Sequence, residues 1–410
     1  MATSPALITP EPAAPEEPAS YRRLFAIRGM VPLVGSSLLS RTALMMSSVA
    51  FALLGLQRFH SASIAGLSIF LLIFPGLVVS PINGALLDRF GRRRLMVLDL
   101  AVAASGLLLL ALLTETNRLG IGVLLLVVSL VSLTSTLSAG GSRSLFPLLV
   151  PNSMWERANA TDAICYGLAA VAGPGLAGAV TGWLGNAAAL VVIAIGYVLA
   201  AVAMLRVPEP AVARTPSRGI LRDAWQGLRL VLSNRTLRWC AVAMSLLNMS
   251  VGLIAVALPV IVLALHGSAA SVGGLFALQG LAGVPAALMA GRMRSLGRER
   301  GVMAMCFVAT GAAVLLLLLP SVAWLAVAMA CVGLLDGPVN VALFSLRQRR
   351  TSREWFGRAF AISIGLNYAG TPIGAAAAGP LVSHSVSTAV VIAAALPLVA
   401  AFAVMRIPRE

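Results

Sequence analysis

Apolar residues form long continuous runs along this chain, separated by short polar or charged connections. Each run holds about twenty residues, the length that an α-helix needs to cross the hydrocarbon core of a bilayer. A membrane β-barrel would instead show segments of roughly ten residues with alternating polarity. Because backbone groups at bilayer depth must be hydrogen-bonded within the protein, such runs predict helices. We predict an all-α membrane protein with twelve spans, near residues 31–56, 62–87, 95–114, 119–143, 158–182, 185–205, 238–265, 270–291, 301–320, 321–346, 359–383 and 386–405.

Arginines gather in alternate connections between these spans. The connections after the second and eighth spans each carry a cluster, at 89–94 and 292–300, whereas those after the fifth, seventh, ninth and eleventh spans carry none. Positive residues favour the cytoplasmic side, and an even number of spans places both termini on that side. We therefore expect a multi-pass protein of the cell inner or plasma membrane with both termini in the cytoplasm.

Composition supports the same class. Charged residues make up 11% of the chain, against about 25% in a typical soluble domain, and the net charge of +16 follows from the loop arginines. We expect no nucleic-acid partner. The four cysteines and three histidines show no metal-binding or disulfide spacing, so we expect no metal. The chain has no lysine for a phosphate-binding loop. We therefore expect that the protein neither hydrolyses ATP nor acts as an enzyme in another way.

The chain divides near its middle. Residues 1–20 are rich in Pro, Ala and Glu and predict a disordered cytosolic tail. Six spans lie in 21–206 and six in 236–410, and similar tracts containing Trp155 and Trp355 begin a Gly/Ala-rich helix in each half. The linker at 207–235 ends in a segment that is either an amphipathic surface helix or a solvated connection. Duplication at half length is typical of transporters, with the substrate site between the halves.

One motif follows the second span, Gly84-Ala-Leu-Leu-Asp88-Arg89-Phe-Gly91-Arg92-Arg-Arg. Gly84 permits a close helix approach and Gly91 a tight turn. Asp88 is a lone acid among arginines at a helix end, suited to a switchable ion pair or to the N-terminus of a facing helix. We call Gly84, Asp88, Arg89, Gly91 and Arg92 the gate motif.

With this motif, residues 21–406 resemble the major facilitator superfamily, and the tract at 141–178 resembles its drug, macrolide and siderophore efflux branch. The resemblance implies twelve transmembrane helices in two pseudo-symmetric six-helix bundles. It also implies that Asp88 and Arg89 stabilise an outward-open state and separate when the protein opens inward. The second half has Arg294 where the matching acid would fall, so a symmetric second gate is not expected.

The fifth span contains Gly173, Pro174 and Gly178. Proline removes a backbone hydrogen bond and kinks a helix, while glycines let a neighbouring helix approach. The segment partly resembles the antiporter motif of the family. Ordinary helix packing is the alternative interpretation.

Charges within spans indicate function, because a charge at the bilayer centre costs roughly 2.5–3.5 kcal/mol on insertion scales. Asp336, in the tenth span, is the candidate site for a proton or cation. It is alternatively a fixed partner of Arg41, in the first span, or a polar helix contact. Arg41 could equally meet an anionic group. The efflux branch tends to carry an acid near this point of the first span, which this chain lacks.

Two further groups of polar residues lie within spans. Asp99, Arg143 and Asp162 are nearer the cytosolic ends, which predicts a gate-side charge cluster. The other group either lines the substrate pocket or forms hydrogen bonds between helices. It consists of Asn340, Tyr166, Asn248, Gln279, Asn367 and Tyr368.

These patterns predict a secondary active transporter that works by alternating access as a monomer, without a cofactor, on a proton gradient. The resemblance favours efflux of an amphipathic small molecule such as a drug, antibiotic or siderophore. Two alternatives stay open: an uptake symporter for a small metabolite, and a transport-inactive membrane partner or sensor.

Overall fold

The computed structural model describes residues 20–151, 154–209, 228–229, 231–292, 298–350, 363 and 365–408. The predicted tail, most of the linker and the connections at 293–297 and 351–362 lie outside these residues. Of the gate motif, the Asp88 backbone is described and its side chain is not.

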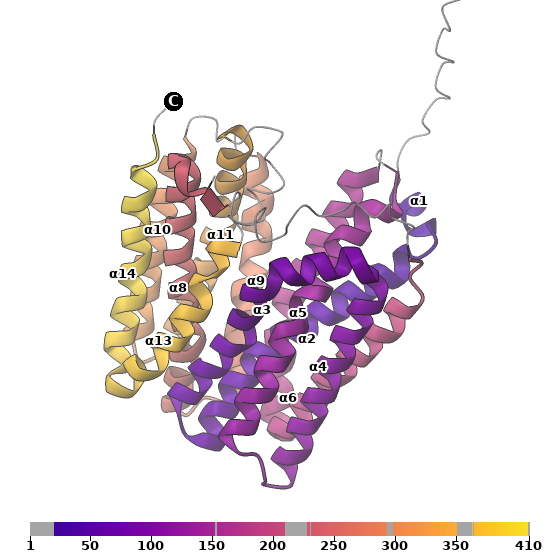
Figure 1. The fold of residues 1–410 in the computed structure, drawn as a ribbon. Coiled ribbons are helices and arrows are strands. Elements are labelled where there is room, and N and C mark those ends of the chain that lie inside the picture. The colour runs from indigo at the N-terminus through magenta and orange to yellow at the C-terminus, as the bar shows by residue number, and fades with distance from the viewer. Residues whose placement is uncertain are drawn as a thin grey trace, which may run out of the picture.

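The described residues form α-helices joined by short connections (Figure 1). The first half contains a short α1 (Tyr21–Ala26), then α2 (Met30–Phe59), α3 (Ala62–Phe90), α4 (Arg92–Glu115), α5 (Ile121–Leu149) and α6 (Trp155–Leu205). The second half contains α8 (Arg235–Ala264), α9 (Ala269–Arg292), α10 (Glu299–Leu315) with the 3-10 turn η2 (Leu316–Leu318), α11 (Val322–Arg350), α13 (Gly370–His384) and α14 (Val386–Met405).

These helices account for the twelve predicted spans. The 51-residue α6 is about 76 Å long at 1.5 Å per residue, enough for two crossings. It breaks at Gly185, whose φ of 85° and ψ of 175° are not helical. Residues 365–368 precede α13 and lengthen the eleventh span. The break at Gly185 agrees with the predicted boundary between the fifth and sixth spans, and the backbone of Pro174 stays helical.

Several helices run further than the charge pattern predicted. The fourth and fifth spans were predicted to end at residue 143 and to begin at residue 158, yet α5 continues to Leu149 and α6 begins at Trp155. Arg143 and Arg157 therefore lie inside helices. Arginine is a good helix former, and its long side chain reaches the headgroup region from within a helix. A helix therefore does not need to end where its charges begin.

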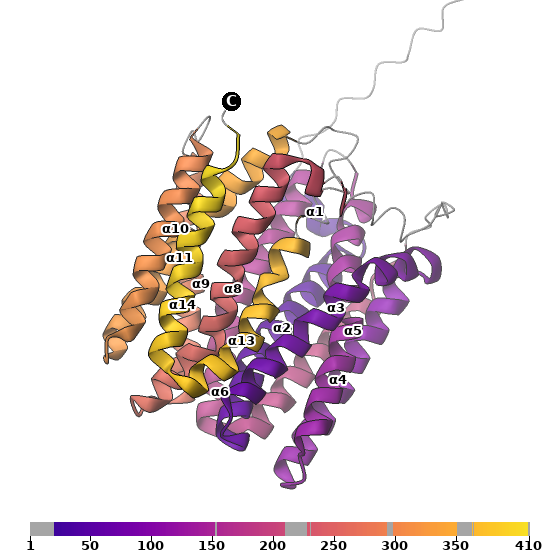
Figure 2. The same cartoon turned by 60° about the vertical axis from the view of Figure 1, so that its left-hand side comes forward.

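The two halves pack alike. In the first half, α2 and α4 pack on α6, and α3 packs on α5. In the second half, α8 and α10 pack on α14, and α9 packs on α11. This repeated scheme gives two six-helix bundles, one indigo to pink and one salmon to yellow in Figure 1. Figure 2 shows the same division from another direction.

The bundles meet where α3 packs on α13 and where α6 packs on α9. We call the end of the molecule that holds Arg92, Arg93 and the C-terminus the arginine-rich side, and the opposite end the arginine-poor side. Backbones touch at the arginine-poor side: a Cβ on Gly178 would lie 2.5 Å from the Ala269 carbonyl oxygen and 2.6 Å from Gly273 Cα. Gly66 approaches the Ala375 carbonyl in the same way. Towards the arginine-rich side the bundles diverge (Figure 1).

An ion pair ties α2 to α6 inside the first bundle. Arg41 Nη2 lies 2.6 Å from Asp162 Oδ1, and Arg41 Nη1 donates to the Asp162 carbonyl at 2.8 Å. The two side chains are 11% and 18% exposed. Arg41 is therefore the partner of Asp162 and not of Asp336, because α2 packs directly on α6 whereas Asp336 belongs to α11.

Replacing Gly178 with alanine should push α6 and α9 apart, because the new methyl group would meet backbone atoms that cannot rotate away. We expect spin labels at positions 183 and 266, on the arginine-poor side, to report longer distances by double electron–electron resonance. Gly167→Ala is the matched control, since no atom of the described residues lies within 4 Å of a Cβ there. Equal distances in both variants would contradict the role of this contact.

Arg41→Ala should lower the thermal unfolding temperature in detergent, because it leaves the Asp162 carboxylate unpaired at bilayer depth. Breaking a buried ion pair costs about 3 kcal/mol, and the partial exposure of this pair makes that an upper value. The double variant Arg41→Gln/Asp162→Asn should recover most of the loss. The exposed Arg118→Ala is the control, and a loss of equal size there would show that the ion pair is not the cause.

Candidate functional site

Side chains from both bundles meet around Tyr166, in the middle of the first crossing of α6. Its phenol hydrogen-bonds with Tyr368, just before α13, and interacts electrostatically with Arg143 of α5 and Asp336 of α11. Tyr166 and Tyr368 are 37% and 45% exposed, although α6 and α13 both pack against other helices. They therefore line the space between the bundles. The structure brings together four of the predicted residues here.

Asp336 borders a small pocket of the second bundle. The pocket has a volume of about 30 Å³, enough for an ordered water molecule. Gln279 of α9 and Thr310 of α10 contribute polar groups, and the remaining lining is mostly aliphatic. Asn340 lies one turn further along α11 and donates to the Asp336 carbonyl at 3.0 Å. Gln279 and Asn340 thus join the predicted site at Asp336.

No ion pair to Asp336 is found among the described residues. The ion pair that they contain joins Arg41 to Asp162 in the first bundle. The Asp336 side chain is exposed on α11, beside the uncharged polar and apolar groups of the pocket. An acid within a membrane span is a candidate for binding a proton or a cation. The arrangement suits the predicted proton or cation site.

Asn248 and Asn367, two predicted pocket residues, differ from the two tyrosines in their surroundings. Asn248 of α8 donates to the Met244 carbonyl at 2.9 Å and accepts from Thr371 of α13 at 3.4 Å. Asn367 is buried at 5% exposure, and its Oδ1 has no partner among the described residues. Neither side chain opens onto the space between the bundles as Tyr166 and Tyr368 do.

The predicted gate-side cluster is split between three places. Asp99 is buried between α4 and α5, where its Oδ2 accepts from the Ser138 backbone N–H at 3.3 Å. Asp162 pairs with Arg41, and Arg143 lies near Tyr166. Residues that lie at similar depth along their helices point in different directions around them, so depth alone did not predict proximity.

The fifth-span motif lies where α6 crosses two helices. Gly173 faces α2, with a Cβ position 2.5 Å from Met45 Cβ and 3.0 Å from the Thr42 carbonyl. Gly178 faces α9, and the Pro174 carbonyl touches Gly273 of the same helix. The predicted close approach is therefore present, and it connects the first bundle to the second.

The gate motif forms the turn between α3 and α4. Gly91 has a φ of 95°, the left-handed conformation expected for its tight turn. Arg92 Nε donates to Ser144 of α5 at 2.9 Å, and Arg89 stacks on the adjacent Phe90 with Cζ 5.4 Å from the ring centroid. Among the described residues, no atom lies within 4 Å of a Cβ at Gly84, so the described part of the chain shows no close approach there. Gly84 lies towards the arginine-rich side, where the bundles diverge.

An acid that the sequence patterns did not indicate also contacts this turn. Glu209, just after α6, accepts from the backbone N–H of Arg92 at 2.7 Å through Oε1 and from that of Arg93 at 2.8 Å through Oε2. The sequence signal was weak: an acid between Pro208 and Pro210, in a stretch interpreted as linker. Its partners lie more than a hundred residues earlier in the chain.

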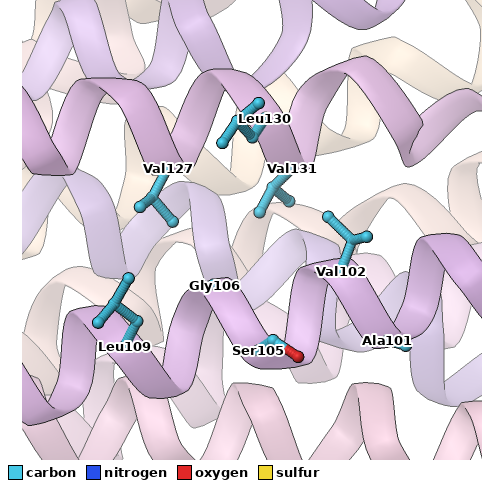
Figure 3. Close-up of a pocket in the computed structure, with 8 residues that line it drawn as sticks. All are labelled: Ala101, Val102, Ser105, Gly106, Leu109, Val127, Leu130 and Val131. Carbon is cyan, nitrogen blue, oxygen red and sulfur yellow. The ribbon is translucent and has the colours of Figure 1, made fainter.

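A larger apolar groove lies elsewhere, between α4 and α5 (Figure 3). It has a volume of about 380 Å³, and Ser105 is the polar side chain among its lining residues. Leu109 and Leu130 at its edges are half-exposed. Both helices lie on the flank of the first bundle away from the second (Figure 2), so the groove faces the surroundings and not the space between the bundles.

Comparison with solved structures identifies the same fold in transporters. A variant of the nucleoside transporter NupG aligns with a TM-score of 0.74 at 15% identity, covering 92% of this chain and 99% of that one. A bacterial homologue of the human lysosomal transporter Spinster, in an inward-facing unoccupied conformation, aligns with a TM-score of 0.67 at 14% identity, covering 93% and 98%.

Sequence relatives extend over nearly the whole chain. The MFS-type transporter y4rN of Sinorhizobium fredii is 37% identical over 406 residues, 96% of this chain and 98% of the relative. The multidrug efflux pump Tap of Mycobacterium tuberculosis is 26% identical over 368 residues, covering 86% and 87%. The family model of the Major Facilitator Superfamily matches residues 33–260 and 240–410. This chain therefore belongs to the Major Facilitator Superfamily of membrane transporters.

Proposed function

We propose that this protein exports amphipathic small molecules by alternating access and that a proton gradient drives the export. The observation that carries the proposal is Asp336, a carboxylate at bilayer depth that has no ion-pair partner among the described residues. It interacts with Tyr166 of the opposite bundle. A solute bound there would touch both bundles, and a proton taken up there would change the charge of the site.

The conformer supports alternating access. Backbones of the two bundles touch at the arginine-poor side, and the bundles diverge towards the arginine-rich side. With the arginines in the cytoplasm, as the distribution of positive residues favours, this conformer is open to the cytoplasm. Within the gate motif, Arg92 contacts Ser144 of its own bundle.

The chemistry around Asp336 favours an amphipathic solute. Two tyrosines offer aromatic surface and hydroxyl groups, and the neighbouring pocket is largely aliphatic. Similarity to the multidrug efflux pump Tap supports export over uptake. One proton moved inward across 100 mV supplies about 2.3 kcal/mol, so a coupled exchange of proton for solute has a usable driving force.

Asp336→Asn should abolish proton-driven export, because the amide cannot gain or lose a proton. In cells lacking their own pumps, we expect the wild type to lower the accumulation of a panel of dyes and antibiotics and a protonophore to reverse this. The variant should export roughly tenfold more slowly or worse, the change that about 1.4 kcal/mol in an activation barrier produces. Asp336→Glu, which still titrates, is the control. Wild-type, protonophore-sensitive export by the Asn variant would refute the role.

Asp88→Asn should slow transport while leaving membrane insertion intact, because the gate is expected to need the charge of this acid when the arginine-rich ends close. Transport rates in proteoliposomes and the yield of folded protein would be measured together. Glu115→Gln, an acid-to-amide change at the other end of α4, is the matched control. Unchanged transport in Asp88→Asn would remove the gate assignment.

A further inference from the structure

The N-terminus of α4 is completed by a residue from another part of the chain. The first N–H groups of a helix have no partner within the helix and are usually satisfied by a side chain at the preceding position. That position in α4 is Gly91, which has no side chain to offer. The Glu209 carboxylate takes its place, with one oxygen on each of the first two N–H groups at 2.7 and 2.8 Å. A negative group is also favoured here by the helix dipole.

The segment that carries Glu209 is held at two further points. The Val207 side chain is fully buried, and its carbonyl accepts from Arg93 Nη1 at 3.3 Å. Gly29 lies in the turn between α1 and α2 and has a φ of 92°. Pro208 packs against it so closely that a Cβ on Gly29 would overlap the proline ring. The start of the linker is thus fixed to the ends of α2 and α4.

The segment after the last helix of each half can be compared between the two halves. Arg206-Val207-Pro208-Glu209 after α6 has its counterpart in Arg406-Ile407-Pro408-Arg409 after α14. Arg300 Nη2 donates to the Met405 carbonyl at 2.7 Å, as Arg93 does to that of Val207. An arginine-to-carbonyl contact thus occurs in both halves, at different positions. In the sequence, Arg409 stands at the position of Glu209 and is followed by Glu410, and α10 carries Glu299 in its first turn.

We propose that Glu209 is a positioning residue of the gate. Its carboxylate fixes the first turn of α4, and with it the Gly91 turn that carries Arg89 and Arg92. Because Glu209 begins the linker to the second bundle, it also joins that linker to the gate. The effect of Glu209 on the gate rests on the proposed function, whereas the contact between Glu209 and α4 is independent of it.

The test compares Glu209→Gln, Asp88→Asn and the double variant. Spin labels at the exposed positions 94 and 406 would report the distance between the arginine-rich ends of the two bundles. We expect Glu209→Gln to lower the population with short distances, as Asp88→Asn does. Each variant changes the ratio of short-distance to long-distance populations by some factor. The factor for the double variant should be at least about twofold smaller than the product of the two single factors, which is the lower range for residues in one coupled network. Glu115→Gln should leave the distances unchanged and combine with Asp88→Asn independently.

Thermal unfolding of each variant separates gate positioning from helix capping. A cap alone predicts a lower unfolding temperature with wild-type distances, and that outcome would overturn the proposal. Independent effects of Glu209→Gln and Asp88→Asn would also overturn it. If Glu209→Gln fails to fold, Glu209→Asp provides the shorter acid for the same measurements. The distances need no transported solute, so they can support the role of Glu209 even if export of every tested compound fails.

Discussion

Hydrocarbon offers no hydrogen bonds, and the rest of this structure follows from that constraint. Each crossing segment satisfies its own backbone by forming a helix, so association between the segments depends on close packing. At the arginine-poor side, the two bundles approach until only glycines fit between their backbones, as at Gly66, Gly178 and Gly273. These contacts leave no room for a Cβ atom, so they fix the distance between the two bundles at this side.

The same constraint separates the charges by role. Arg41 and Asp162 neutralise each other and join two helices of one bundle. Asp99 is buried against a backbone N–H of α5. Asp336 has no ion pair among the described residues and faces the tyrosines of the space between the bundles. The Arg41–Asp162 pair thus lies within one bundle, whereas Asp336 interacts with Tyr166 of the other bundle.

The two halves repeat their packing but differ in chemistry. The repeated scheme of helix contacts fixes the architecture. On this frame the first half adds the gate motif and the Glu209 cap on α4, whereas the second half adds Asp336 and its pocket. Duplication supplies two similar bundles, and divergence places the gate motif in one and Asp336 in the other.

The sequence by itself determined the fold class, the number of spans and the fixed turn at Gly91, because hydrophobic length and glycine conformation are local properties of the chain. It also identified Tyr166, Tyr368, Gln279 and Asp336 as polar groups within spans. Only the tertiary structure decided which of them meet. It assigned Arg41 to Asp162, used Asn248 to join α8 to α13, and placed Glu209 on a helix that begins more than a hundred residues earlier. The rotation of each helix about its axis and the crossing of distant helices depend on the packing of all neighbours at once, and no local pattern in the sequence records them.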